Sequence, residues 1–378
     1  MYDSATMSDS PELPYWLALR RAGLGSTNFA LLLSRYGGIR EAWQAPSGDL
    51  NRIGMDQQYV VAMTKARATF APERELELLR VHDARALTWL DSAFPESLKE
   101  IPQSPPVLFV RGARDPQFPQ AVAVVGTRHI TPYGRQATEH FCEALARAGV
   151  AIISGLARGV DAIAHRVALE NGAPTVAALA GGIDQVYPRE NAGLAERILE
   201  NGCLVSEYPV GIPARRDYFP RRNRIISGLA RATLIVEAGE GSGALHTANW
   251  AFEQGRDVFA IPGSIFSRQS QGTNQLIRES TAKIVVTPEQ LCEELNLISA
   301  GSQLPLTSNP NAALPLREAP AATPDEESLL GYLNDKALHI DEIARATGQP
   351  IAMISSALQI MELKGLIRQN GPMSYSKA

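Results

Sequence analysis

The 378-residue sequence lacks lysine where its core is expected. No lysine occurs between Ile101 and Ala282, although the chain has 36 lysines and arginines in total. A P-loop needs a lysine for its phosphates and Schiff-base catalysis needs one as nucleophile, so both are excluded for this region. Every permanently charged cation there must be arginine, which combines bidentate phosphate binding with base stacking better than lysine does.

Cysteines and long apolar runs are also scarce. The three cysteines, Cys142, Cys203 and Cys292, are widely spaced. This spacing indicates neither a disulfide framework nor a zinc site, and we expect reduced, buried thiols. No run approaches the ~20 consecutive apolar residues of a membrane helix, and the first residues lack the order of a signal peptide. We therefore expect a soluble, cytoplasmic protein without a membrane contact.

Positive charge is gathered in one strip of an acidic chain. Basic and acidic residues number 36 and 40, yet six arginines and a single acid fall between Gly211 and Arg231. The six are Arg215, Arg216, Arg221, Arg222, Arg224 and Arg231. Such a strip favours a polyanionic partner, and the rings of Tyr218 and Phe219 within it suit the splayed bases of single-stranded nucleic acid. The alternative is a solvated helix face.

Short apolar runs recur regularly after residue 120. Each is rich in β-branched residues and is followed by glycine or polar residues and then by a helical period. The runs are AVAVVG, VAIISG, TVAALAGG, CLVSE, TLIVEAG and DVFAIPG. They predict an α/β fold over residues 76–297, a Rossmann-like doubly wound domain with a parallel sheet. Ligands of such sheets bind beyond the carboxyl ends of the strands.

The flanking regions have different compositions. Residues 1–75 predict a small helical domain, with a break at Gly37-Gly38. Residues 298–325 are rich in Ser, Asn, Ala and Pro and predict a flexible linker. Residues 326–378 predict three amphipathic helices and a final pair of strands, which together form a winged helix. Its charges are balanced, so protein and DNA contact stay equally open for this domain.

Two loops of the α/β domain are suited to anions. Gly126-Thr127-Arg128 ends the first strand just before a helix starts near Pro132. No GxGxxG fingerprint follows, so we expect no dinucleotide cofactor. The second loop, residues 237–247, is glycine-rich and enters a helix, which suits a phosphate.

Phosphoribohydrolases use the same loop position to cleave nucleotides, with a catalytic glutamate on the first helical turn. Leu245 and His246 stand in the matching turn of this sequence. We therefore expect no enzyme activity, and keep a nucleotide or nucleoside-monophosphate hydrolase of this Rossmann type as the alternative.

Isolated histidines and carboxylates complete the candidates. His165 and His246 have no nucleophile at triad spacing, so packing or hydrogen bonding is expected of them. Four carboxylates fall near predicted strand ends: Asp161, Asp184, Glu207 and Glu237. Because they are scattered among arginines, structural ion pairs are favoured over a metal site, and we expect no bound metal.

The ordered motifs resemble those of the DprA (Smf) family of DNA-processing proteins. They are GTR at 126–128, SGLARGVDAIAHRVAL at 154–169, AGGIDQVYPREN at 180–191, SEYP at 206–209, FPRRNRIISGLA at 219–230, VEAGEGSGALHTA at 236–248 and PGSIFSRQSQGTNQLI at 262–277. The resemblance spans roughly residues 100–290. The flanking domains resemble the SAM-like and winged-helix domains that accompany it in many members.

This resemblance implies a non-enzymatic protein that binds single-stranded DNA without regard to sequence. It also implies a homodimer, formed through the Rossmann-like domain, that protects incoming strands in natural transformation and helps to load the recombinase RecA. By motif, Arg128 would hold phosphate, Arg216 would take a basic position often held by lysine, and Phe219 would stack on a base. Arg222 and Arg224 would line or brace the same pocket.

The full predicted set of DNA contacts is Gly126, Thr127, Arg128, Gly155, Arg158, Arg215, Arg216, Phe219, Arg221, Arg222, Arg224, Ser242 and Gly243. One departure from the family pattern is the segment 279–282, ESTA, which lacks the usual glycine before the alanine. This departure puts the shape of that loop in doubt.

Overall fold

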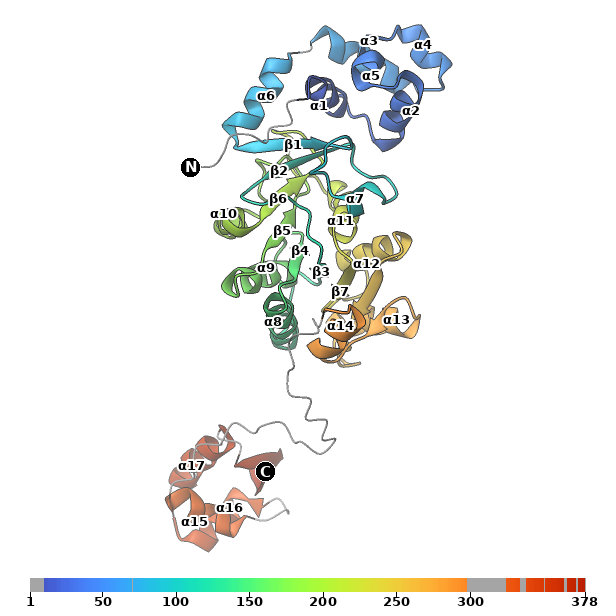
Figure 1. The fold of residues 1–378 in the computed structure, drawn as a ribbon. Helices are drawn as coiled ribbons and strands as arrows, with labels where there is room; N and C mark the ends of the chain where they lie inside the picture. Colours follow the sequence, from blue (N-terminus) through green and yellow to red (C-terminus); the bar gives the residue numbers. More distant parts are fainter. Residues whose placement is uncertain are drawn as a thin grey trace. The chain divides into compact units, whose positions relative to one another are not determined.

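The chain forms two compact units, Met1–Ser299 and Ala300–Ala378. The computed structural model (Figure 1) describes residues 10–69, 71–297, 324–333, 338–349, 351–363, 366–371 and 373–377. Within these residues, every helix is too short or too polar to cross a membrane.

The first unit is built on a nine-stranded sheet with the strand order β1-β2-β6-β5-β4-β3-β7-β8-β9. Its strands are β1 (Ala84–Thr88), β2 (Val107–Arg111), β3 (Ala121–Val125), β4 (Ala151–Ser154), β5 (Thr175–Ala178), β6 (Cys203–Ser206), β7 (Ala232–Ile235), β8 (Asp257–Ala260) and β9 (Lys283–Ile284). Neighbours from β6 to β9 are parallel, whereas β1 and β2 are antiparallel additions at the β6 edge. The predicted Rossmann-like α/β fold is confirmed, and its six predicted strands are β3 to β8.

Helices cover both faces of this sheet (Figure 1). One face carries α8 (Pro132–Arg147), α9 (Val160–Glu170), α10 (Ala192–Asn201) and α14 (Pro288–Glu294), and the other carries α7 (Glu96–Lys99), α11 (Tyr218–Gly228), α12 (Gly243–Glu253) and α13 (Gln271–Arg278). Successive strand residues alternate between the two layers: Val122 and Val124 pack with α8, whereas Ala123 and Val125 pack with α11 and α12. The central strands are therefore buried on both sides.

The strand order reverses at β3. This strand pairs with β4 on one side and β7 on the other, in parallel with both. The chain runs from β3 through β4 and β5 to β6 and then returns to β7, so the connections after β3 and β7 diverge at the carboxyl edge. Such a reversal opens a crevice for a ligand.

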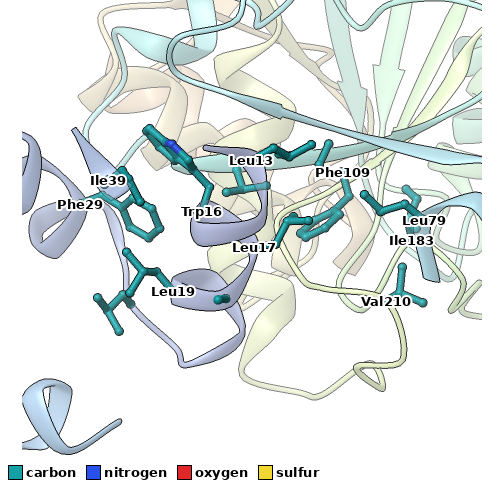
Figure 2. Packing of buried hydrophobic residues seen from close by; sticks show 14 of the residues in the cluster. Leu13, Trp16, Leu17, Leu19, Phe29, Ile39, Leu79, Phe109, Ile183 and Val210 are labelled. Carbon is teal, nitrogen blue, oxygen red and sulfur yellow. The ribbon is translucent and has the colours of Figure 1, made fainter. Parts of the chain in front are cut away.

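The amino-terminal helices pack on the edge of the same sheet. They are α1 (Leu13–Arg21), α2 (Ser26–Tyr36), α3 (Ile39–Gln44), α4 (Ser47–Arg52), α5 (Gln57–Ala68) and α6 (Pro72–Val81). Trp16 stacks on Phe29 with centroids 5.1 Å apart, while Leu17 belongs to one cluster with Phe109 of β2 (Figure 2). Gly37 ends α2 in the left-handed region, at φ 76°, which agrees with the break expected there.

Two features lie at the edges of the sheet. The segment VLFVR, which is not among the six predicted strands, forms β2 and pairs with β6 through Phe109 and Ser206. Three prolines stand just before this five-residue run, so the sequence did not favour a strand there. In the loop that lacks the family's glycine, Ser280 itself adopts a left-handed φ of 56° before β9, a conformation that costs a serine more than a glycine.

The second unit confirms the winged helix. Its elements are α15 (Pro324–Tyr332), β10 (Leu338–His339), α16 (Ile340–Thr347), α17 (Ile351–Leu363), β11 (Ile367–Gly371) and β12 (Ser374–Lys377). The strands form an antiparallel sheet in the order β10-β12-β11. Ile343, Leu358 and Tyr375 meet in its core.

Candidate nucleic-acid interface

A cleft of about 460 Å³ opens at the reversal of strand order. The loop after β3, the first turns of α11 and the glycine-rich loop before α12 form its walls. Predicted contacts in its lining are Gly126, Thr127, Arg128, Phe219, Arg222, Ser242 and Gly243. Three segments of the sequence up to 117 positions apart (243 minus 126) are thus brought together by the parallel sheet.

The loop after β3 is fixed by its backbone. Thr127 N donates to the carbonyl of Glu237 at 2.7 Å. A Cβ on Gly126 would lie 2.5 Å from Val160, so only glycine fits there. The Arg128 side chain is exposed at the rim of the cleft.

The anion position expected at the start of α8 is filled by the protein itself. Thr131 donates to the carboxylate of Glu237 from its backbone N at 3.0 Å and from Oγ1 at 2.6 Å. The carboxylate is buried, and a Cβ on Gly134 would lie 2.0 Å from it. Glu237 therefore supplies the negative charge that a helix amino terminus favours. A phosphate at Arg128 would depend on its guanidinium rather than on this helix.

Phe219 lies close to two guanidinium groups. The guanidinium carbons of Arg128 and Arg222 are 5.2 and 5.8 Å from its ring centroid. Tyr187 approaches the same ring edge-on, with centroids 5.7 Å apart. Arg158 joins Arg128, Tyr187 and Phe219 around a small adjoining hollow. Arginine and aromatic faces are therefore combined at one side of the cleft.

Arg222 is a buried side chain that supports the cleft. It is only 3% exposed and donates from Nη1 to the carbonyls of Gly155, at 2.8 Å, and of Ala178. Burial lowers the pKa of Arg222 to about 10, although Asp161 opposes the shift. A Cβ on Gly155 would lie 2.6 Å from the guanidinium. Gly155 thus makes room for Arg222, which ties α11 to the ends of β4 and β5.

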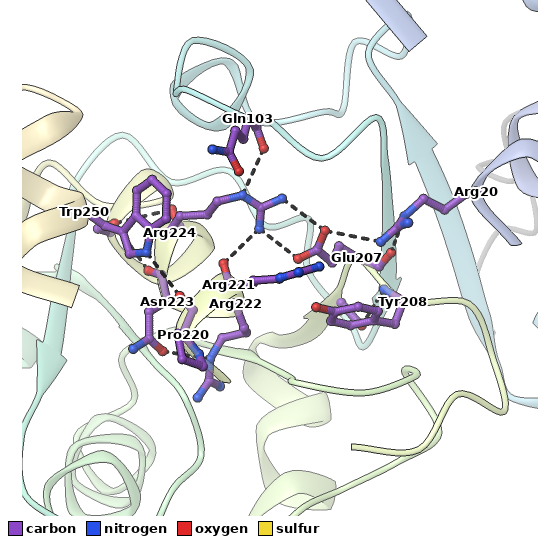
Figure 3. A network of polar contacts seen from close by, with 12 residues as sticks. Arg20, Gln103, Glu207, Tyr208, Pro220, Arg221, Arg222, Asn223, Arg224 and Trp250 are labelled. Atoms are coloured by element: carbon purple, nitrogen blue, oxygen red, sulfur yellow. Dashed lines mark hydrogen bonds and ion pairs between the residues drawn. The ribbon is translucent and has the colours of Figure 1, made fainter. Parts of the chain in front are cut away.

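Arg224 faces a buried carboxylate and is absent from the cleft lining (Figure 3). Its Nη1 and Nη2 donate to Glu207 at 2.8 and 3.0 Å, and its Nε donates to the carbonyl of Gln103. Arg20 of α1 donates to the same carboxylate at 3.3 Å. Burial by itself raises the pKa of Glu207, but Arg224 and Arg20 outweigh it and hold the pKa below its usual value. This ion pair joins α11 to the amino-terminal helices.

The other predicted arginines are exposed. Arg215 pairs with Asp217 at 3.1 Å, and Arg158 forms a two-point pair with Glu190 at 2.6 and 2.8 Å. Arg216 and Arg221 are exposed as well, and no ion pair involves either side chain among the described residues. The structure therefore divides the arginine strip into a buried set and an exposed set.

The isolated carboxylates have internal partners, but Glu207 alone among the four forms an ion pair in the described residues. Asp161 accepts a hydrogen bond from Gly155 N at 3.1 Å, and burial raises its pKa. Asp184 accepts from Gly211 N at 2.8 Å. The expectation of ion pairs was thus wrong for most of them, because backbone amides satisfy them instead.

The two histidines differ. His165 is buried and its Nδ1 lies 2.7 Å from Thr175 Oγ1, which confirms a packing and hydrogen-bonding role. Burial and the charge of Arg222 lower its pKa to about 3. His246 is exposed and lines the cleft.

Sequence reasoning missed several residues of the cleft. His129, Asn223 and Gln269 line it, and Tyr187 lines the adjoining hollow. Asn223 Nδ2 donates to the carbonyl of Gly243 at 3.1 Å and so joins α11 to the glycine-rich loop. Three of the four lie within the family motifs, which was an available signal.

The fold and cleft define a class of protein, a Rossmann-like domain with an arginine-lined crevice followed by a winged helix. The sequence pattern of DNA recombination-mediator protein A matches residues 85–296, and that of the DprA winged helix domain matches residues 313–371. Protein Smf of Synechocystis is 34% identical over 97% of this chain and 99% of its own length. Protein Smf of Escherichia coli is 36% identical over 86% and 87%. The chain belongs to the DprA/Smf family, whose members are named for DNA processing.

Solved structures agree with this assignment. DprA of Streptococcus pneumoniae superimposes with a TM-score of 0.66 at 33% identity, covering 74% of this chain and 97% of that protein. DprA of Helicobacter pylori, a structure described for its single-stranded DNA binding mode, gives a TM-score of 0.52 at 28% identity over 56% and 95%.

Proposed function

We propose that the protein binds single-stranded DNA in this cleft without regard to base sequence. The observation that carries the proposal is the Phe219 ring beside the exposed guanidinium group of Arg128, both in the lining of the cleft. A ring can stack on any base, while a guanidinium holds the neighbouring phosphate. The Helicobacter pylori relative, described for single-stranded DNA binding, supports the same reading.

Selectivity for single strands follows from the same geometry. The base that stacks on Phe219 must first be splayed from its neighbours, and in a duplex this unstacking costs a few kcal/mol. The side chains of Arg222 and Asn223, which line the cleft, already donate to backbone carbonyls and so brace its wall rather than read a base. Affinity therefore comes from charge and stacking, which every base sequence supplies.

The finer part of the proposal concerns partners. The matched family is described as a recombination mediator, and the resemblance supports protection of incoming strands and loading of RecA in the cytoplasm during natural transformation. It also supports a homodimer. The short edge strand β9 exposes Ile284, and Val286 follows it, which offers an apolar edge to a second copy. RecA filament assembly on DNA coated with a single-strand-binding protein should be faster with this protein than without it.

The cleft is tested by fluorescence anisotropy of a labelled oligothymidine across a salt series, with a duplex competitor. Wild-type protein should bind tightly, prefer the single strand and weaken as salt rises. Arg216→Ala should weaken binding about tenfold, because Arg216 lies outside the cleft lining but stands on the exposed loop just before α11, where it can hold a phosphate of the bound strand. Arg231→Ala is the matched control, because Arg231 belongs to the same strip but its backbone N donates to Ala121 O at the opposite, amino-terminal edge of the sheet.

A nucleotide hydrolase remains the alternative, because the loop of residues 239–243 lines the cleft beside His246. Release of free base from a panel of nucleotides, with no binding of oligothymidine, would favour the hydrolase and contradict the proposed DNA binding. Equal affinity for duplex and single strand would also contradict it.

A further inference from the structure

A turn between β8 and α13 exposes two apolar side chains. Ile265 is 79% exposed and Phe266 is 93% exposed, the highest value for a large hydrophobic residue in the described part of the chain. Ser267 N donates to the carbonyl of Ser264 at 3.0 Å and Phe266 N to Ser264 Oγ at 3.3 Å, so the turn is formed rather than frayed. An exposed phenylalanine beside an exposed isoleucine on a formed turn is available for a contact outside the chain.

The turn is anchored firmly at its base. Asn274 of α13 exchanges two hydrogen bonds with the backbone of Gly263, at 3.1 and 3.0 Å. Tyr133 of α8 donates to the carbonyl of Pro262 at 2.6 Å. The ring of Phe266 therefore projects from a held backbone, which lowers the entropy that a ligand must remove on binding.

The same segment continues the wall of the cleft. Gln269 lines the cleft and donates to the carbonyl of His129 at 3.3 Å. A Cβ on Gly239, another lining residue, would lie 3.1 Å from the carbonyl oxygen of Arg268. Phe266 is three residues before Gln269, so their Cα atoms are within about 11 Å of each other. A DNA strand that leaves the cleft past Gln269 would therefore reach the turn of Phe266.

The turn also repeats the chemistry of the first site. Arg268 is exposed and has no ion pair among the residues that the structure describes. Arg268 is two residues from Phe266, so this turn carries an aromatic ring and an arginine without an ion pair in the described part of the chain. The cleft carries the same kinds of side chain in Arg128 and the half-buried Phe219. Positive charge beside the ring favours a nucleic-acid strand over an apolar protein surface.

We propose that Phe266 is a second base-stacking position, which holds a nucleotide of the single strand just outside the cleft, with Arg268 on its phosphate. This inference rests on the proposed function and extends it from one stacking ring to two. It predicts a longer bound segment than the cleft alone can cover.

The test measures the affinity of wild type and Phe266→Ala for oligothymidines of increasing length. Strands long enough to reach the turn should bind the variant about tenfold more weakly, within the range for loss of one base stack. The shortest strands that bind should lose nothing. Phe252→Ala is the matched control, because Phe252 is also an exposed phenylalanine but lies near the carboxyl end of α12, and only the opposite end of this helix lines the cleft.

Two further substitutions separate stacking from apolar contact. Phe266→Tyr keeps an aromatic ring and should retain wild-type affinity, whereas Phe266→Leu keeps an apolar side chain and should bind like the alanine variant. In addition, Phe266→Trp should report strand binding by quenching of its added fluorescence.

The outcomes distinguish this inference from the proposed function. If wild type binds single strands and Phe219→Ala weakens binding but Phe266→Ala does not at any length, only the second stacking position is overturned. If wild type binds no single strand, both fail together. If Phe266→Ala changes the mass of the protein in solution and not its affinity, the turn is a contact between protein copies and the inference is wrong.

Discussion

The arginine strip contains a buried half and an exposed half that perform different tasks. Arg222 and Arg224 are 3% and 6% exposed and donate to carbonyls or to Glu207. Arg215 and Arg216 lie on the exposed loop before α11. The buried pair holds α11 against the sheet and the amino-terminal helices, whereas the exposed pair presents charge to solvent. A cluster of like charges in a sequence is therefore not a single surface feature.

The position of each residue along α11 decides which half it joins. Every residue from Arg222 to Gly228 is buried, because this part of the helix lies between the sheet and its neighbours. The first turn, with Phe219, reaches the carboxyl edge of the sheet and the cleft. One helix thus supplies both the support and part of the lining of the proposed binding cleft.

Breaking the buried half should have the largest effect. Arg224→Leu leaves Glu207 buried with Arg20 as its remaining partner, and removal of one member of a buried pair costs about 3 kcal/mol of unfolding free energy. Urea unfolding measures this change. Arg215→Ala, an exposed arginine of the same strip, should leave the urea midpoint unchanged, and an equal loss in both variants would contradict the division.

Acid should destabilise the fold next, through the buried histidine that senses the charge of Arg222. Burial and Arg222 hold the pKa of His165 at about 3, whereas an unfolded histidine titrates near 6.5. As pH falls below ~6.5 the unfolded chain takes up the proton first, so stability is complete above that value and is lost toward pH 3. The loss is up to about 1.4 kcal/mol per pH unit, or roughly 2 kcal/mol between pH 6 and pH 4.

His165→Gln provides the control for this pH effect, since glutamine does not titrate and can still hydrogen-bond Thr175. Urea midpoints of wild type should fall more steeply between pH 6 and pH 4 than those of the variant. Parallel slopes would show that other groups cause the acid sensitivity.

Sequence reasoning predicted the arginine strip and the strands around it, but it did not separate the buried arginines of the strip from the exposed ones. The alternation of short apolar runs with helical periods is local, so six strands of the sheet and the edge at which the cleft opens were predictable. The pairing of Arg224 with Glu207 and Arg20 joins residues up to 204 positions apart (224 minus 20). Such contacts depend on the folded topology, and nothing local separates Arg224 from Arg216.

The role of Glu237 was hidden for the same reason. Its carboxylate accepts a hydrogen bond from Thr131, 106 positions away in the sequence. The amino terminus of α8, which we expected to bind an anion, therefore binds the carboxylate of Glu237 instead. The exposure of Phe266 could not be predicted either, because an apolar loop residue is expected to be packed until its neighbours in the fold are known.

Removing charge from the rim should affect binding and leave folding intact. Arg128→Ala should weaken oligothymidine binding about tenfold, because the guanidinium beside Phe219 is exposed and free of a carboxylate partner in the described residues. The slope of log affinity against log salt should fall by about 0.7, the value for one phosphate contact on a single strand. An unchanged slope would place phosphate elsewhere.

Arg158→Ala, which removes an exposed but ion-paired arginine outside the strip, should have the smallest effect. Arg158 stands at the hollow beside Phe219, but its guanidinium is held in a two-point pair by Glu190, which raises its pKa through hydrogen bonding and charge. A guanidinium already neutralised attracts phosphate weakly, so anisotropy should register less than about a threefold loss of affinity. Glu190→Gln should instead strengthen binding, since it frees the same guanidinium. If both substitutions weaken binding equally, the ion pair of Arg158 and Glu190 supports the structure of the site, and Arg158 is not a reserve of positive charge for phosphate.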